Sequence, residues 1–259
     1  MRSSRLIRAA VALALLAQPW ILNAATPDPV PAGLEKTLRS RFTEVNILSI
    51  KPAPVAGLFE VFTGDSIAYA NANGDFLLVG SLMDTRTHAN LTTQRLDEMN
   101  SIDFAALPFD RAIKVVKGNG RRKLAIFADP DCPYCQQLEK EMASMTDVTV
   151  YTFLYPLERV HPHATEKAHA IWCATDRSHA WTQWRVEQRA PDAVGTCKDD
   201  PITALQQLGT TLRISSTPTL FLSNGRRIGG AVETEKLEKM LDASAAAPAA
   251  SPPVGMLTR

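Results

Sequence analysis

Cys132 and Cys135, separated by Pro133 and Tyr134, are the residues of this 259-residue sequence best suited to chemistry. They follow an apolar run at 123–127 that predicts a strand, and Cys135 opens a series of apolar residues at helical spacing. The unpaired N–H groups and the dipole at a helix start favour the nucleophilic thiolate. We therefore predict thiol–disulfide exchange, in which Cys132 attacks a substrate disulfide and Cys135 resolves the mixed disulfide. We expect Cys132 to be the more exposed of the two, with Cys135 packed against the core.

Two other interpretations of a C-x-x-C motif are half of a zinc site and an inert structural disulfide. A closed zinc site needs four ligands, usually from a second nearby pair. The sequence has no second C-x-x-C, although His161 and His163 are available as further ligands. We predict no metal and no cofactor.

The first 25 residues have the pattern of a secretory signal peptide. Arginines at 2, 5 and 8 precede an apolar run at 9–17 and small residues at 23–25. The run is too short to span a bilayer as a helix, and an uncleaved anchor is the alternative. Because disulfides persist outside the cytosol, the four cysteines are expected to be redox-active or structural. A formal net charge of +1 gives no indication of a nucleic-acid partner.

Two further features lie after the motif. Cys173 and Cys197 are 24 positions apart, and in an exported protein we expect them to form a structural disulfide, with two free thiols as the alternative. Thr217-Pro218 stands before an apolar run at 219–222. A proline is tolerated at the first residue of a strand. The functional interpretation is a cis proline whose turn faces the active cysteines.

The chain after the signal peptide is predicted to form two domains joined by a helix. Residues 26–87 contain a helix at 34–42 and strands at 45–50, 58–62, 66–70 and 76–79, a small α+β unit whose core would be marginal alone. Residues 88–107 contain no glycine or proline and predict a stiff linker, helical over 91–106.

Residues 108–242 are predicted to form an α/β domain. Strands are expected at 112–116, 123–127, 148–154, 219–222 and 226–228, with helices at the motif, at 164–186 and at 233–241. This order indicates a mixed sheet. Residues 243–259 are of low complexity and predict a disordered tail.

This plan resembles the DsbC/DsbG family of periplasmic thiol:disulfide isomerases, which are thioredoxin-like. The resemblance covers residues 35–241 and is most specific at 123–135 and at 216–219. It implies an α/β thioredoxin-fold catalytic domain joined by a linker helix to a small α+β N-terminal dimerisation domain, in a V-shaped homodimer with a shared cleft. By position, it makes Cys132 and Cys135 the redox pair, Cys173 and Cys197 the structural disulfide, and Pro218 the cis proline. The implied substrate-binding residues are Thr217, Pro218, Pro133 and Tyr134.

The resemblance further implies isomerisation of non-native disulfides in the periplasm, together with chaperone activity. The implied partners are misfolded disulfide-containing exported proteins and a membrane thiol reductase of DsbD type as electron donor. The alternatives are a protein disulfide or sulfenic-acid reductase of DsbG type, and a holdase chaperone without chemistry.

The sequence departs from the pattern in two places. The family's usual pair between the cysteines is Gly-Tyr, whereas Pro133-Tyr134 is the pair familiar from glutaredoxins, which is expected to alter the redox poise. Ordinary thioredoxins carry a buried acid six residues before the first active cysteine, and Ile126 stands there instead. Asp129 and Asp131 are nearer to Cys132, where an acid is expected to oppose thiolate formation.

Overall fold

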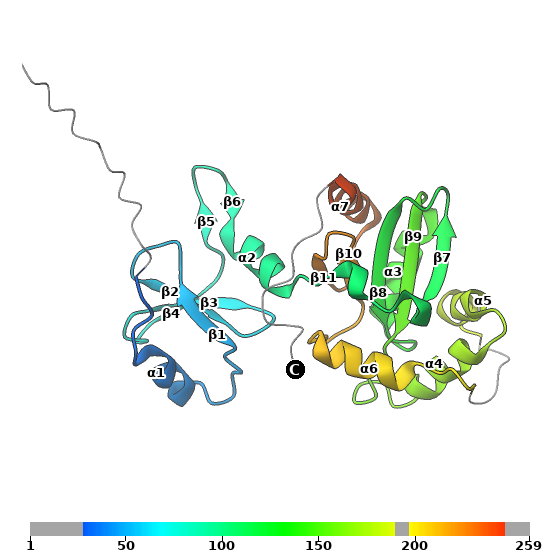
Figure 1. Ribbon diagram of the computed structural model, residues 1–259, viewed down its shortest axis with the longest axis horizontal. Coiled ribbons are helices and arrows are strands. Elements are labelled where there is room, and N and C mark those ends of the chain that lie inside the picture. The colour runs from blue at the N-terminus through cyan, green and yellow to red at the C-terminus, as the bar shows by residue number, and fades with distance from the viewer. Residues whose placement is uncertain (1–27, 190–196, 247–259) are drawn as a thin grey trace, which may run out of the picture.

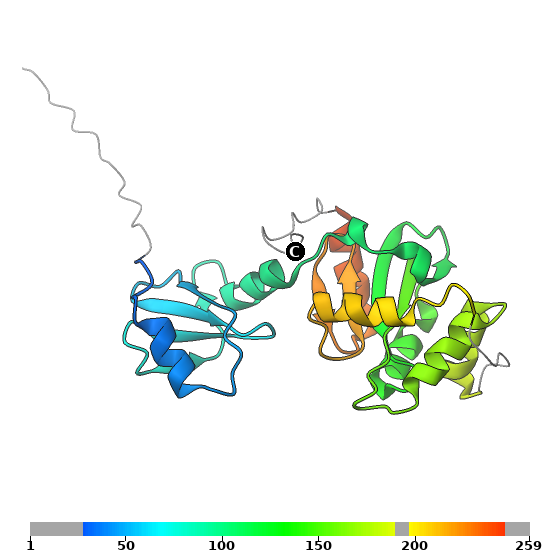
Figure 2. The ribbon, with the colours of Figure 1, turned by 60° about the horizontal axis from the view of Figure 1, so that its bottom comes forward.

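The computed structural model describes residues 28–189 and 197–246. The signal peptide predicted at 1–25 and residues 247–259 of the predicted tail lie outside the described residues. Figures 1 and 2 show a blue and cyan N-terminal body and a larger green-to-red C-terminal body, connected by a helical segment. Within the described residues, no helix combines the length and the apolar character needed to cross a membrane.

The N-terminal body is a helix on a four-stranded antiparallel sheet, in the strand order β1-β2-β3-β4. Leu34 and Leu38 lie one turn apart on the helix and are buried with Phe59 and Val61, which share one face of a strand. The elements are α1 (Leu34–Arg41), β1 (Ser49–Pro52), β2 (Leu58–Phe62), β3 (Ile67–Asn71) and β4 (Leu77–Val79).

The first strand begins four residues later than the predicted start at 45. The N–H groups of Val45 and Ile47 donate to the nearby carbonyls of Phe42 and Val45, at 3.2 and 3.0 Å. A backbone whose N–H groups are used in such local turns cannot pair with a neighbouring strand. The ladder therefore starts near Leu48, whose N–H reaches the Phe62 carbonyl at 2.8 Å.

The connecting segment is less helical than predicted. A short hairpin of β5 (Met83–Asp84) and β6 (Ala89–Asn90) precedes α2 (Leu91–Asn100), and only the 3-10 turn η1 (Phe104–Ala106) follows. Asn90 begins the helix because its side chain accepts the Thr93 N–H at 2.9 Å. Ser101 is extended and ends it. The prediction of one helix over 91–106 is therefore wrong after residue 100.

The C-terminal body is built on a five-stranded mixed sheet in the order β11-β10-β8-β9-β7. β8 and β9 are parallel, and the other neighbours are antiparallel, as the order of predicted elements indicated. The strands are β7 (Ile113–Lys117), β8 (Arg122–Ala128), β9 (Val148–Leu154), β10 (Thr219–Leu222) and β11 (Arg227–Gly229).

Helices cover both faces of this sheet (Figure 1). Leu124 and Ile126 of β8 are buried in one apolar cluster, whereas Phe127 is stacked on Phe153 in the cluster of the opposite face. A central strand covered on both faces is apolar throughout. The helices are η2 (Phe109–Arg111), α3 (Pro133–Glu141), η3 (Met142–Ser144), α4 (Ala164–Cys173), α5 (Arg177–Thr182), the π-helix η4 (Gln183–Glu187), α6 (Ile202–Thr211) and α7 (Thr234–Ala246).

Three helical predictions differ from the structure. The helix expected at 164–186 is broken, because Ala174 is extended and Asp176 caps a new helix through the His179 N–H at 3.0 Å. Helix α6 was not predicted. Helix α7 continues to Ala246, so residues 243–246 are helical rather than part of a disordered tail. Ser244 is buried in this extension and contacts Ser223.

Candidate active site

The turn from β8 into α3 is built around the buried carboxylate of Asp129. Its oxygens accept the backbone N–H groups of Asp131 at 2.7 Å and Leu157 at 2.6 Å. The backbone carbonyl of Asp129 accepts the Cys132 N–H at 3.2 Å. These bonds fix the path of the chain, so that Cys132 is the N-cap of α3 and Pro133 occupies the first turn, where its missing N–H leaves no bond unmade.

Both active-site sulfurs are free thiols in buried residues. Cys132 is 4% exposed and Cys135 is 1% exposed, so Cys132 is the more exposed of the two, as expected, although both residues are buried. The Cys132 thiol donates to the Thr217 carbonyl at 3.2 Å, a contact from a segment 85 residues away that covers it. Tyr134, between the cysteines, is instead 62% exposed.

The surroundings of Cys132 favour its thiolate. A hydrogen bond from the Cys135 side chain is the largest cause that lowers the pKa of Cys132 from 9.0 to about 5. The Thr217 side chain and the backbone N–H groups of Cys135 and Tyr134 add to this effect, and burial opposes it. Burial raises the pKa of Cys135, which therefore remains a thiol.

The acids near the motif do not prevent this ionisation. Both Asp129 oxygens accept backbone N–H groups. Asp131 is paired with Lys167, whose Nζ lies 2.7 Å from each carboxylate oxygen. Each negative charge is thus engaged locally by donors or by a cation.

Thr217 and Pro218 lie beside the motif because β10 pairs with β8. The register places Thr219 opposite Phe127, so the chain just before β10 meets the end of β8 that leads into the active cysteines. The Thr217–Pro218 peptide bond is cis, and both residues are buried. The Pro218 carbonyl accepts the Gly230 N–H at 2.8 Å, which ties this turn to the segment after β11.

Trp184 and Arg185, which sequence reasoning did not select, also contact the active-site turn. The Trp184 Nε1–H donates to the Pro130 carbonyl at 2.6 Å. The Arg185 guanidinium donates to the same carbonyl and, at 2.6 Å, to that of Cys132. Both residues belong to η4, more than 50 positions after Cys132, and no local pattern connects the two segments.

Comparison with known proteins agrees with this arrangement. Residues 109–245 match the model of the thioredoxin-like domain, and residues 23–93 match that of the disulfide bond isomerase protein N-terminal domain. The chain is 37% identical over 220 residues to a probable thiol:disulfide interchange protein DsbC of Bordetella pertussis, covering 85% of this chain and 77% of that protein. The chain belongs to the DsbC family.

One further relative and one solved structure extend this relationship. The DsbC of Escherichia coli is 27% identical over 216 residues, covering 82% of this chain and 87% of that protein. The crystal structure of a disulfide interchange protein from Neisseria gonorrhoeae is 42% identical, covers 54% of this chain and 99% of its own, and has a TM-score of 0.52. The predicted family and the thioredoxin-like fold are therefore confirmed, and the protein is a thiol:disulfide oxidoreductase.

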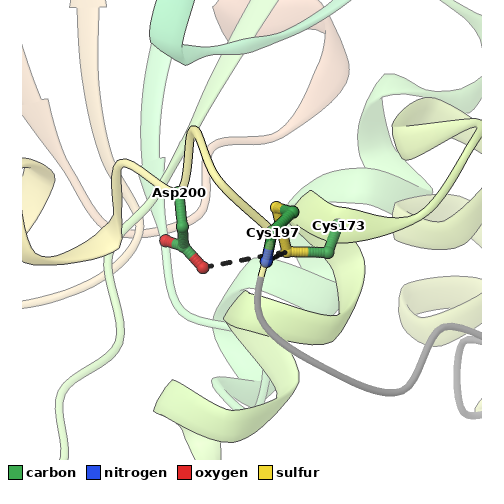
Figure 3. Close-up of side chains that lie close together, drawn as sticks. All are labelled: Cys173, Cys197 and Asp200. Atoms are coloured by element: carbon green, nitrogen blue, oxygen red, sulfur yellow. Dashed lines mark hydrogen bonds between the residues drawn. A yellow bond between two sulfur atoms is a disulfide. The ribbon is translucent and has the colours of Figure 1, made fainter.

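This DsbC-family chain carries its second cysteine pair as a disulfide (Figure 3). Cys173 and Cys197 are joined by an S–S bond of 2.15 Å, with their Cα atoms 5.5 Å apart. The bond ties the last residue of α4 to the segment before α6. Asp200 lies beside it, with Oδ2 3.9 Å from Cys173 Sγ (Figure 3).

These three residues also form the cluster of potential metal ligands within the described part of the chain. Both sulfurs are held in the disulfide, so neither offers the thiolate that metal ligation uses. His161 and His163, the further zinc ligands considered for the C-x-x-C motif, are not in this cluster. His161 lies 3.1 Å from Asp129, and His163 lies 3.8 Å from Glu166.

Proposed function

We propose that this protein isomerises non-native disulfides of exported proteins in the periplasm, with Cys132 and Cys135 as its redox pair. One observation carries the proposal: the free thiol of Cys132 is at the N-cap of α3, where unpaired N–H groups favour its thiolate, and Cys135 lies beside it as a buried free thiol. At neutral pH the first sulfur is a nucleophile and the second remains in reserve. The first sulfur can then form a mixed disulfide, and the second can release the protein from it.

The reaction begins when the Cys132 thiolate attacks a wrong disulfide and forms a mixed disulfide. The substrate sulfur that leaves is then free to attack another bond in the same substrate. If a substrate thiolate displaces Cys132, the substrate has been isomerised, and if Cys135 displaces it, the substrate has been reduced. Thr217, Pro218 and the exposed Pro133 and Tyr134 border Cys132 and are assigned to substrate contact. The Cys173–Cys197 disulfide is assigned a structural role.

We assign the N-terminal body to homodimer formation. β4 is the last strand of its sheet, so one edge is free to pair. Phe76, Leu78 and Val79 on or beside it are 75%, 53% and 83% exposed. Exposed apolar residues on a free strand edge favour a second copy of the chain as partner. Such a dimer would hold two catalytic domains over a shared cleft, the arrangement proposed to provide chaperone activity.

A signal peptide at 1–25 would deliver the protein to the periplasm, where a membrane thiol reductase of DsbD type would reduce Cys132 and Cys135.

The test is recovery of activity from scrambled, fully oxidised ribonuclease by the mature protein. Cys132→Ser should reduce recovery to the uncatalysed background, because the hydroxyl that replaces the thiolate cannot form a mixed disulfide. The same variant should still suppress aggregation of an unfolded protein if the cleft acts as a chaperone. No recovery by the wild type, together with rapid reduction of a model disulfide, would contradict isomerisation and assign the protein to the reductases.

A further inference from the structure

Arg185 is a buried cation placed directly against the active-site turn. Arg185 is only 2% exposed to solvent. The guanidinium donates to the carbonyls of Pro130 and Cys132, which lie on either side of Asp131. A planar guanidinium offers its N–H groups in a fixed fork, so two carbonyls bound to it are held at a fixed separation. The side chain therefore constrains the backbone that carries Cys132.

The charge of Arg185 is not neutralised by a close partner. No carboxylate oxygen lies within 4.0 Å of it among the described residues, and its Nε has no hydrogen-bond partner there. A buried, unpaired charge is costly, and Trp181, whose ring centroid is 5.7 Å from the guanidinium carbon, provides the nearest aromatic face. Such a cation is retained at a cost in stability, which points to a use in the reaction.

Negative charge on either of the two sulfurs stabilises the charged form of Arg185. Burial lowers the pKa of Arg185, whereas negative charge on Cys135 or Cys132 raises it. Reciprocally, Arg185 lowers the pKa of Cys135, against the larger effect of burial. In the resting protein Cys132 carries the negative charge. After Cys132 has formed a mixed disulfide, that charge is gone, and Cys135 is the sulfur that must ionise.

We propose that Arg185 is a positioning residue for the resolving half of the exchange, where it holds the active-site turn and stabilises the developing Cys135 thiolate. The proposal deepens the proposed function and rests on it. In the step concerned, the Cys135 thiol gives its proton to solvent and its sulfur attacks Cys132 Sγ. The Cys132–Cys135 bond forms, the bond from Cys132 to the substrate sulfur breaks, and the substrate thiolate leaves with the electron pair and takes up a proton. The two cysteines are oxidised and the substrate disulfide is reduced.

Other charged groups face the same region and must be kept constant in any test. Glu139 lies one turn after Cys135 on α3, and its carboxylate accepts the Trp181 Nε1–H at 2.7 Å. Burial raises the pKa of Glu139, and Arg185 and Lys117 lower it. The remaining groups are Asp129 with His161 and Asp131 with Lys167.

The experiment follows the reduced protein reacting with an aromatic disulfide whose thiolate product is coloured. Attack by Cys132 releases the first coloured thiolate, and resolution by Cys135 releases the second, so stopped-flow absorbance separates the two steps. We compare the wild type with Arg185→Met and Arg185→Lys across pH. The matched control is Arg122→Met, which also removes a buried guanidinium bonded to two backbone carbonyls, at the opposite end of β8.

Arg185→Met is expected to slow the second phase about tenfold at neutral pH and to move its pH profile upward by about one unit, because each unit of thiol pKa changes the thiolate fraction tenfold. The first phase should change little, since Cys132 with a pKa of about 5 stays ionised at neutral pH. Arg185→Lys should restore most of the pH profile because it restores the charge. Arg122→Met should leave both phases as in the wild type.

A second phase in folded Arg185→Met with the wild-type rate and pH profile would overturn the proposal. Equal slowing in Arg185→Met and Arg185→Lys would overturn the assigned role of the charge. If Arg185→Met does not fold, Arg185→Gln provides a second neutral variant with one amide donor, and the same criteria apply. Failure of the wild type to recover scrambled ribonuclease would contradict the proposed function but would leave the two-phase kinetics intact, so the two failures are distinguishable.

Discussion

The two cysteine pairs of this chain lie in one domain but at opposite kinds of helix end. Cys132 caps the N-terminus of α3, whereas Cys173 is the last residue of α4. Free N–H groups at a helix start stabilise a thiolate, and free carbonyls at a helix end oppose one. Asp200 adds a carboxylate 3.9 Å from Cys173 Sγ, a further obstacle to negative charge on that sulfur.

This difference supports the proposed assignment of Cys132 and Cys135 as the reactive pair and of Cys173 and Cys197 as the structural pair. A thiolate must form both when a cysteine attacks and when it leaves a disulfide. Cys132 meets that requirement, because its neighbours lower its pKa to about 5. Cys173 would have to leave as a thiolate beside a carboxylate and a helix C-terminus. Placement on the helix therefore supports the proposal that the first pair exchanges and the second pair holds the fold.

The largest predicted effect is on the ionisation of the Cys132 thiol compared with an ordinary cysteine thiol. Between a pKa of 9.0 and one of about 5, the ratio of thiolate to thiol at a given pH changes about ten-thousandfold. We expect the ultraviolet absorbance of the reduced protein to show one thiolate that is lost as the pH falls through about 5. Since the pKa of Cys132 is lowered, its thiolate is present at all higher pH values.

Two variants assign this signal. Cys132→Ser should abolish the transition near pH 5, and Cys135→Ala should move it to higher pH because the largest lowering hydrogen bond comes from the Cys135 side chain. An unchanged transition in Cys132→Ser would show that another group titrates there.

The next contrast is in stability. Cys173→Ala/Cys197→Ala should destabilise the protein by about 3 kcal/mol, because the cross-link closes a loop of 24 residues in the unfolded chain. Urea unfolding in non-reducing buffer measures the change. Activity per folded molecule should persist, since neither sulfur touches the active-site turn.

The matched variant is Cys132→Ala/Cys135→Ala, which removes a pair spaced by only two residues. Cys132 and Cys135 are free thiols, so their replacement removes no cross-link, and the expected loss of stability is clearly lower. Equal losses in the two double variants would contradict the assignment of a structural role to Cys173–Cys197 alone.

Local sequence patterns predicted the parts of the fold that are themselves local. The strands at 58–62, 148–154 and 219–222 have the predicted limits because each is an apolar run bounded by residues that break it. The motif, the strand before it and the helix after it follow from one continuous segment. Helix α6 was missed because Gly209 interrupts its apolar face. A Cβ there would lie 2.1 Å from Tyr155 Cε2, so close packing against the ring requires the glycine.

The active site was predicted only as far as its own segment extends. Cys132 is buried because Thr217 reaches it through the pairing of β10 with β8, and a sequence shows neither the pairing nor the resulting exposure. Arg185 reaches the same turn from a π-helix, a geometry that shifts side chains away from ordinary helical spacing. Contacts between segments far apart in the sequence produce no periodic pattern of apolar residues, so the sequence does not predict them.

The smallest predicted difference is in the stability lost when one tryptophan near each cysteine pair, Trp172 or Trp184, is replaced by phenylalanine. Trp172 Nε1–H donates to the Asp199 carbonyl at 2.9 Å, and no other donor to that oxygen is found among the described residues. Trp184 Nε1–H donates to the Pro130 carbonyl at 2.6 Å, which Arg185 also binds. Removing a donor costs more when the acceptor is left unpaired. Trp172→Phe should therefore cost about 1 kcal/mol, and Trp184→Phe less than about 0.5 kcal/mol.

Urea unfolding of both variants under the same conditions measures this difference. The two substitutions remove the same atoms, and a second donor is present only at the Pro130 carbonyl. A larger loss in Trp184→Phe would mean that the indole, rather than the guanidinium, holds the active-site turn. In that case Arg185→Lys should change the free energy of unfolding little. The two hydrogen bonds from the Arg185 guanidinium to the Pro130 and Cys132 carbonyls would then not account for the geometry of the active-site turn. A larger loss in Trp172→Phe would leave Arg185 as the main support of the reactive pair, and the indole as the main support of the segment that carries the inert one.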